Sequence, residues 1–297
     1  MRDTAVLNLP ALPNITVAQL QYLIAAVDHA TWAEAATALG TSQSAVSQGL
    51  AELQRRLGIE LFERSGRRRV PLPHAAPVID HARRVLAQTA NLHEWAAALR
   101  AGSTGPLRVG MIDVAAVDHF GDSLRTFRSH HPDVNLLLSV APSSQLVASL
   151  RRAELDLIVC VRPASEDLAV EPLLDEPLHA YAPPDQGPTP TGSWGPWVTF
   201  PAGSRTRELI EAAVRANGSP FDVVGESHQP EVLREMVRLG MGWTVLPAIQ
   251  AERSPGALRP VTAEPVAHRT LVTARRVDAV PSPPSDRLIE ELHRAVG

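Results

Sequence analysis

The sequence predicts an N-terminal all-α winged helix-turn-helix, a long linker helix and a C-terminal α/β region of two lobes. Three observations lead there: short amphipathic helices before residue 60, an unbroken heptad pattern between 74 and 100, and alternating apolar strands and helices from residue 107. We therefore expect domains at residues 1–73, 74–105 and 106–297. Within the last, lobe I covers about 106–162 and 263–297, and lobe II about 163–262.

The composition is that of a globular protein without a membrane segment. Of 297 residues, 44% are hydrophobic and 20% charged, and no run reaches the ~18 apolar residues of a membrane span. Residues 1–16 lack the features of a secretory signal, so we expect a cytoplasmic protein. All 28 basic residues are arginine, which excludes mechanisms that need a lysine, and a single cysteine excludes an internal disulfide.

Positive charge is concentrated near the N-terminus. Residues 1–100 contain ten Arg against eight Asp and Glu, a balance of +2, whereas the whole chain carries −4 and the remainder therefore −6. Six of the ten arginines lie between Arg55 and Arg69. Such a patch permits this end of the chain to bind a polyanion, although an ordinary solvated surface also explains it.

Capping residues mark the three N-terminal helices. The first two have capping boxes and the third a serine cap, at Thr16 with Gln19, Thr31 with Glu34, and Ser42. Gly40 and Gly58 end the second and third helices. The second helix has about two turns and the gap after it about three residues, as in a helix-turn-helix.

The third helix has one apolar face and one polar face with almost no charge. The apolar face holds Val46, Leu50, Leu53 and Leu57, and the opposite face holds Ser44, Ser47, Gln48, Ala51 and Arg55. Amides and hydroxyls donate and accept hydrogen bonds, as a face that reads base edges in the DNA major groove must. The alternative is a helical hairpin with a polar outer face.

The segment "IELFERSGRRRVPLP" predicts a β-hairpin wing. Two short apolar runs flank the turn "RSGRR", and the hairpin carries Arg64, Arg67, Arg68 and Arg69. Arginines on a wing suit contacts to phosphates, which position a protein on DNA without specifying sequence.

The long helix, about 74–100, carries a heptad seam. Its positions are Val78, Ala82, Val85, Thr89, Leu92, Ala96 and Leu99. Such a seam favours dimerisation through this helix, whereas the alternative is a helix lying on its own domain. Pro77 is tolerated because it falls in the first turn, and residues 100–106 follow as a linker.

The C-terminal region alternates strands and helices, which predicts parallel sheets. In lobe I we expect strands at "LRVGMI", "VNLLLSV" and "LDLIVCV", with helices at "VDHFGDSLRTFRSHHP" and "SSQLVASLRRAE" between them. A second unit follows a proline-rich stretch, with strands at "WVTF", "FDVVGES" and "WTVLP". The C-terminal "HRTLVTARR" and "SDRLIEELHRAV" then return to the first unit.

The order of these parts resembles the LysR-type transcriptional regulators across essentially the whole chain. The similarity rests on "LQYLIAAVDHATWAEAATALGTSQSAVSQGLAELQRRLGIELFER", close to the family's N-terminal signature, and on "RLGMGWTVLP" at 238–247. The resemblance implies a bacterial cytoplasmic regulator that forms a homodimer through the linker helix and often a tetramer. It also implies lobes like those of periplasmic binding proteins, with a small co-inducer in their cleft, and RNA polymerase as a candidate partner.

The resemblance also suggests DNA contacts. By position, the residues that meet the operator are Ser42, Gln43, Ser44, Ser47 and Gln48, with Arg64 on the backbone. Three departures stand out. Ala33 replaces a usual hydroxyl, Gln48 replaces a frequent basic residue, and "PLPHAA" replaces the usual start of the linker helix. With the face and wing residues above, the expected DNA-binding set is Ser42, Gln43, Ser44, Ser47, Gln48, Arg55, Arg64, Arg67, Arg68 and Arg69.

The predicted effector cleft lies where ligands bind in open α/β sheets, beyond the carboxyl ends of the strands. Four loops meet this condition, at 112–116, 141–144, 200–207 and 226–231. The resemblance implies that the same four loops bind the ligand. Their candidate residues are Asp113, Val114, Ser143, Ser144, Phe200, Ser204, Arg205, His228 and Gln229. The helix start at "AGSR" suits an anion, but Asp113 favours a ligand with an amine or hydroxyl. For Asp113, Ser143, Ser204 and Arg205, a role as a helix cap or in a surface ion pair explains the side chain equally well.

Other chemistry finds little support. The eleven histidines lack ligand-like spacing, Cys160 lies in an apolar strand, and no G-x-S-x-G motif occurs, so we expect no metal, no cofactor and no catalysis. The predicted function is a sequence-specific DNA-binding transcriptional regulator controlled by a small-molecule effector. Two rivals are an enzyme fused to a DNA-binding domain and a ligand-independent regulator whose lobes only oligomerise.

Overall fold

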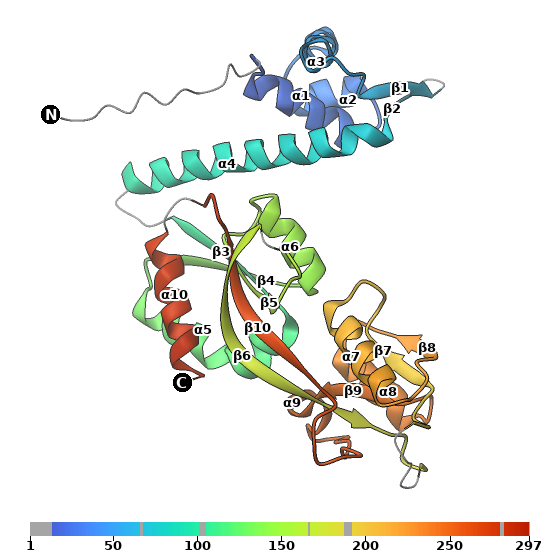
Figure 1. The fold of residues 1–297 in the computed structure, drawn as a ribbon. Coiled ribbons are helices and arrows are strands. Elements are labelled where there is room, and N and C mark those ends of the chain that lie inside the picture. Colours follow the sequence, from blue (N-terminus) through green and yellow to red (C-terminus); the bar gives the residue numbers. More distant parts are fainter. Residues whose placement is uncertain are drawn as a thin grey trace, which may run out of the picture. The chain divides into compact units, whose positions relative to one another are not determined.

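The computed structural model describes residues 14–65, 68–100, 105–165, 167–186, 192–279 and 282–296. The chain forms two compact units, Met1–Glu94 and Trp95–Gly297 (Figure 1). Within the described residues, no helix is long and apolar enough to cross a membrane.

The N-terminal unit is a winged helix-turn-helix, as predicted. Its helices are α1 (Val17–Asp28), α2 (Trp32–Ala38) and α3 (Gln43–Leu57), and the antiparallel strands β1 (Phe62–Ser65) and β2 (Arg68–Pro71) form the wing. A 3-10 turn, η1 (Pro73–Ala75), leads into the long helix α4 (Ala76–Arg100).

The predicted N-caps of the first two helices are confirmed. The hydroxyl of Thr16 accepts a hydrogen bond from the backbone N–H of Gln19, whose side chain accepts one from the N–H of Thr16. Thr31 caps α2 in the same way, but Glu34 bonds the N–H of Ala30 instead of that of Thr31. The second capping box is therefore displaced by one residue.

A glycine allows α1 and α3 to approach closely in the N-terminal core. A Cβ atom at Gly49 would lie 2.4 Å from Cδ2 and 2.7 Å from Cε2 of Tyr22. The fully buried side chains of this core include Leu23, Val46, Leu50, Leu53 and Leu61. This close contact with α1 fixes the position of α3 in the N-terminal unit.

The heptad seam of α4 begins inside the core of its own unit. Ala82 is fully buried there, and Val78 and Val85 pack against the same core. Further along, Leu92 and Trp95 are 58% and 50% exposed. The alternative that the helix lies on its own domain therefore holds for its first half, because one apolar stripe serves either purpose.

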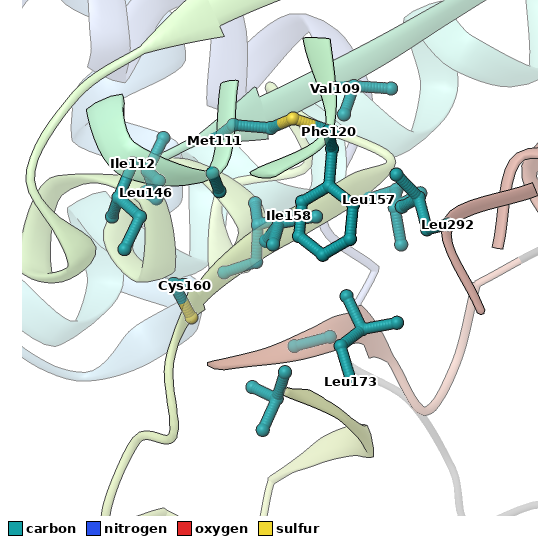
Figure 2. Close-up of a cluster of buried hydrophobic side chains, with 14 of the residues drawn as sticks. Val109, Met111, Ile112, Phe120, Leu146, Leu157, Ile158, Cys160, Leu173 and Leu292 are labelled. Atoms are coloured by element: carbon teal, nitrogen blue, oxygen red, sulfur yellow. The ribbon is translucent and has the colours of Figure 1, made fainter. Parts of the chain in front are cut away.

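Lobe I of the C-terminal unit contains the predicted parallel strands. These are β3 (Pro106–Met111), β4 (Asn135–Val140) and β5 (Leu157–Val161), in a six-stranded sheet of order β4-β3-β5-β10-β6-β9. The helices are α5 (Gly121–His130), α6 (Ser143–Arg151) and α10 (Pro283–Arg294). The predicted single helix from Val117 is instead a π-turn, η2 (Ala115–His119), followed by α5. Figure 2 shows the core, where Met111, Phe120, Ile158 and Leu292 meet.

Lobe II contains a smaller parallel pair of strands. These are β7 (Trp197–Thr199) and β8 (Val223–Glu226), with β9 (Thr244–Pro247) beside them and helices α7 (Arg205–Ala216), α8 (Pro230–Arg238) and α9 (Ala248–Ala251). Trp194, Trp197 and Trp243 are buried together in its core.

Two long antiparallel strands, β6 (Leu168–Tyr181) and β10 (Ala267–Arg276), connect the lobes and are called the crossover strands below (Figure 1). Beyond its pairing with β6, strand β10 pairs with β5 of lobe I, while β6 pairs with β9 of lobe II. The predicted return of the C-terminal segment to lobe I is confirmed by α10. The sequence does not indicate β6, because Pro172 and Pro177 interrupt the alternating pattern of a strand.

We predict that Gly49→Ala destabilises the N-terminal unit by about 1 kcal/mol. Overpacking against Tyr22 costs roughly 1–3 kcal/mol, and the better helix propensity of Ala returns about 1 kcal/mol. In a Tyr22→Ala background the steric term is gone, so Gly49→Ala should stabilise the unit. Urea unfolding of the four proteins, followed by circular dichroism, measures both effects. Destabilisation of equal size in both backgrounds would contradict the close contact.

Candidate functional site

The outer face of α3 is exposed and polar, opposite its buried face. Ser44, Ser47, Gln48, Ala51 and Arg55 are all exposed, whereas Val46, Leu50 and Leu53 on the other side are fully buried. Gly58, with φ of 70°, ends the helix. The helix therefore presents amides and hydroxyls to solvent along its first turns.

The first turn of α3 is held by Ser42. Its hydroxyl accepts a hydrogen bond from the N–H of Ala45 at 3.2 Å and lies 2.9 Å from the hydroxyl of Ser44. Gln43 and Gln48 are exposed. Ser42 thus orders the N-terminal end of the helix. The side-chain amides of Gln43 and Gln48 take no part in this cap.

Arg55 is held on the helix surface by a carboxylate. Its Nε and Nη2 atoms each donate to Glu52 at 2.6 Å, and Arg56 donates to the same carboxylate at 2.5 Å. These hydrogen bonds from Arg55 and Arg56 lower the pKa of Glu52 to about 2. Contact between Arg55 and a phosphate would require it to leave Glu52.

The wing is anchored to α2 through an arginine. The guanidinium of Arg69 lies 5.2 Å from the ring centre of Trp32, whose indole packs edge-on against Phe62. Arg67 lies outside the described residues, as do the side chains of Arg64 and Arg68. Ala33, one of the family departures, lies exposed in α2.

Two of the predicted cleft residues of lobe I, Asp113 and Ser143, accept hydrogen bonds. A carboxylate oxygen of Asp113 accepts from Nε2 of Gln250 in α9 at 3.2 Å, so this bond joins the two lobes. The hydroxyl of Ser143 accepts from the N–H of Val161 at 3.2 Å, while Ser144 is exposed.

Three helices begin at the predicted loops without a side-chain cap. The N-cap residues are Pro142 of α6, Ser204 of α7 and Gln229 of α8. The first N–H groups of a helix have no partner within it and carry partial positive charge. Arg205 at the start of α7 pairs with Glu208 at 2.8 Å, and His228 is exposed.

Two predicted cleft residues lie in the cores instead. Val114 is fully buried in the core of lobe I, and Phe200 is 7% exposed in the core of lobe II. Their side chains pack within these cores.

A buried charged network, which sequence reasoning missed, lies on the crossover strands. Arg269 of β10 and Glu176 of β6 are cross-strand partners, 4% and 3% exposed, and Nε of Arg269 donates to the carboxylate at 2.6 Å. His119 of η2 contacts the other carboxylate oxygen at 2.6 Å, and Nη1 of Arg269 donates to the hydroxyl of Thr206 in α7 at 3.2 Å. The network thus joins lobe I, both crossover strands and lobe II.

The network keeps its carboxylate ionised despite burial. Burial raises the pKa of Glu176, but the hydrogen bonds and charges of His119 and Arg269 outweigh burial and leave it below its usual value. The available signal in the sequence was an arginine inside the apolar strand "HRTLVTARR".

The described part of the C-terminal unit includes the following two hollows. One, of about 570 Å³, lies between η2 of lobe I and α9 of lobe II and is lined by Val117, Asp118, Ala248, Ile249, Glu252 and Arg253. Arg253 and Asp118 form an ion pair across it at 3.2 Å. The other, of about 310 Å³, is lined by Gly121, Leu124, Arg125, Arg128, Leu136 and Leu138 on lobe I. The described residues contain no group of three or more His, Cys, Asp or Glu that could hold a metal ion.

A winged helix-turn-helix with a polar third helix, followed by a two-lobed α/β unit, defines the class of DNA-binding regulators that carry an effector domain. Comparison with known families is specific. Residues 17–76 match the bacterial regulatory helix-turn-helix protein of the lysR family, and residues 100–297 match the LysR substrate binding domain. The chain belongs to the LysR family of transcriptional regulators.

Individual relatives agree with this family. A probable hydrogen peroxide-inducible genes activator of Streptomyces viridosporus is 29% identical over 95% of this chain and 94% of its own. The uncharacterized regulator YfeR of Shigella flexneri is 26% identical over 89% and 88%. Among solved structures, a full-length OxyR variant from Pseudomonas aeruginosa has a TM-score of 0.61 at 28% identity, covering 95% and 94%. CbnR bound to its target DNA shares the fold, with a TM-score of 0.66 at 21% identity over 94% and 99%.

We predict that Arg269→Met costs about 3–5 kcal/mol of stability, because it leaves Glu176 buried without its arginine partner. The double variant Arg269→Met/Glu176→Met should recover most of the loss. Urea unfolding of the full chain, followed by tryptophan fluorescence, measures both changes.

The same pair should make stability depend on pH. Because the folded-state pKa of Glu176 is depressed, its contribution is fully present above its ordinary pKa of 4.5 and is lost as the pH falls through the folded-state value. In Glu176→Gln, the free energy of unfolding should therefore depend less on pH at acid pH than it does in the wild type. An unchanged acid limb in this variant would contradict the assignment.

Proposed function

We propose that α3 reads base edges in the major groove through Gln43, Ser44, Ser47 and Gln48, while the wing arginines contact phosphates. The observation that carries this proposal is the exposed, nearly uncharged polar face of α3 opposite its fully buried face. Hydrogen-bonding groups without strong charge suit the mixed donors and acceptors of base edges. Ser42 acts as the cap that orders this end, and Arg55 is a phosphate contact only after leaving Glu52.

The proposal includes a homodimer formed through the exposed part of α4, with tetramers built from it. Leu92 and Trp95 supply exposed apolar surface for that pairing. Two-fold pairing implies half-sites in adjacent major grooves, about 34 Å apart. The functional division follows residues 1–73, 74–105 and 106–297, and the protein acts in the cytoplasm on chromosomal DNA with RNA polymerase as a candidate partner. Its output is altered DNA binding, and no catalytic step is part of the proposal.

The effector is proposed to bind between the lobes, near the starts of α6, α7 and α8. Two facts support this place. Helix starts without side-chain caps are available to ligand groups, and bonds such as that between Asp113 and Gln250 join the lobes where a ligand can replace them. A ligand that prefers one arrangement of the lobes changes its population, and through it the DNA contacts.

Sensing of peroxide by a thiol is not part of this proposal, although one relative is named for peroxide-inducible genes. Cys160 is the single cysteine, it is fully buried, and burial raises its pKa to about 12. The reactive form of cysteine is the exposed thiolate, so this thiol is inert in the folded protein.

We predict that two variants distinguish base recognition from phosphate contact. Gln43→Ala should relax the preference for one base pair by roughly 1–3 kcal/mol. Arg68→Ala should weaken all sequences alike and reduce the salt dependence of binding by about one phosphate contact. Binding to DNA upstream of the protein's own gene, and to single-base variants of it, measures both. Arg125→Ala, which removes an exposed arginine of α5, is the matched control. A selective change of base preference in Arg68→Ala would contradict the assignment of the wing.

Effector control is tested by thermal shift against amino acids, organic acids, nucleobases and aromatic acids, with each hit examined by DNA footprinting. We expect one class to raise the melting temperature and alter the footprint. The rival, a ligand-independent regulator whose lobes only oligomerise, predicts no ligand-dependent change in either measurement while DNA binding stays intact.

A further inference from the structure

A carboxylate lies between two guanidinium groups in the second half of α3. Both oxygens of Glu52 accept hydrogen bonds from Arg55, one from Nε and one from Nη2, each at 2.6 Å. Nε of Arg56 donates to one of the same oxygens at 2.5 Å. These hydrogen bonds lower the pKa of Glu52, so the carboxylate is ionised at neutral pH. The cluster therefore holds two positive charges and one negative charge.

The two arginines differ in how far they are exposed. The side chain of Arg55 is 70% exposed, whereas that of Arg56 is 24% exposed. An ion pair between side chains in contact with water is weak, because water and salt screen it. Arg55 can therefore exchange Glu52 for another anion, while the less exposed Arg56 remains on the carboxylate.

The position of the cluster along α3 places it beside the DNA backbone when the helix reads bases. Glu52 and Arg55 follow Gln48 and Ala51 by one turn on the outer face. Arg55 lies twelve residues after Gln43, which is about 18 Å along a helix, and the major groove is only about 12 Å wide. When the first turns of α3 contact base edges, the end that carries Arg55 lies near phosphates. Glu52 then competes with those phosphates, because both are anions.

We propose that Glu52 is an internal competitor of the DNA phosphates for Arg55, and that it limits the affinity of α3 for DNA of any sequence. On binding, Arg55 leaves Glu52 for a phosphate, while Arg56 stays on the carboxylate. One ion pair replaces another, so the new contact adds less affinity than an unpaired arginine would add. This inference rests on the proposed function, because it concerns how the same reading helix binds DNA.

The test is binding of the full chain to a duplex from upstream of its own gene and to a duplex of shuffled sequence, measured by fluorescence anisotropy at several salt concentrations. Glu52→Gln should bind both duplexes roughly 2- to 5-fold more tightly for each α3 helix, because Arg55 no longer leaves an ionic partner. A contact to phosphate carries no sequence information, so the two gains should be equal. Arg55→Gln should weaken both complexes and reduce their salt dependence by about one phosphate contact.

A matched control and a double variant separate competition from a change of net charge. Glu60→Gln removes the same charge from an exposed position in the loop after α3, and it should tighten binding less than Glu52→Gln does. In an Arg55→Gln background, Glu52→Gln should tighten binding no more than Glu60→Gln does in the wild type. Circular dichroism and urea unfolding establish that each variant is folded at the assay temperature.

Equal tightening by Glu52→Gln and Glu60→Gln would overturn the competition, and so would a gain from Glu52→Gln that is the same with and without Arg55. A change of base preference in Glu52→Gln would also overturn it, because the carboxylate would then contact a base, and α3 would remain the reading helix. Failure of the proposed function is a separate result. In that case Gln43→Ala would leave the preference for the upstream duplex unchanged, whatever the effect of Glu52→Gln.

Discussion

The arrangement of the C-terminal unit depends on one buried ion pair, that of Glu176 and Arg269 on the crossover strands. Both strands are shared by the two lobes, and the pair lies directly across the ladder between them. Each charge is also bound to one lobe, the carboxylate to His119 and the guanidinium to Thr206. Two apolar side chains would fill the same volume but would form no directional hydrogen bonds to the two lobes. A buried pair is instead stable only while both partners keep their geometry, since displacement leaves a charge uncompensated.

In the N-terminal unit, helix α3 exposes a polar face to solvent while its opposite face is packed in the core. Val46, Leu50 and Leu53 are fully buried, and Gly49 brings Tyr22 of α1 against the backbone of α3. The outer face is then free of any packing role. The same core includes Ala82 of α4, so the long helix starts as part of the reading domain. In the proposed dimer, a pairing of two such helices would therefore fix the separation of two reading faces.

How far the sequence predicts this structure depends on whether the signal is local. Thr16, Ser42 and Gly58 were predictable because a cap or a helix end involves residues three or four positions apart. The winged helix-turn-helix and the parallel strands of lobe I followed from such signals. Strand β6 could not be predicted in this way, because Pro172 interrupts the sequence pattern of a strand. The pair of Glu176 and Arg269 joins residues 93 positions apart, and nothing near either residue shows that the other lies opposite. For Val114 and Phe200, no local pattern separates a core side chain from one that lines a cleft.

The contacts between the lobes fall into two kinds, and the difference suggests how a ligand could act. The network around Glu176 and Arg269 is buried and lies on the strands that both lobes share. The bond of Asp113 with Gln250 also joins the lobes, and the ion pair of Asp118 with Arg253 lies at the hollow, where a ligand group can replace it. A ligand shifts a conformational equilibrium only by the difference between its affinities for the two states. A ligand that exchanges contacts at the hollow would create such a difference between lobe arrangements.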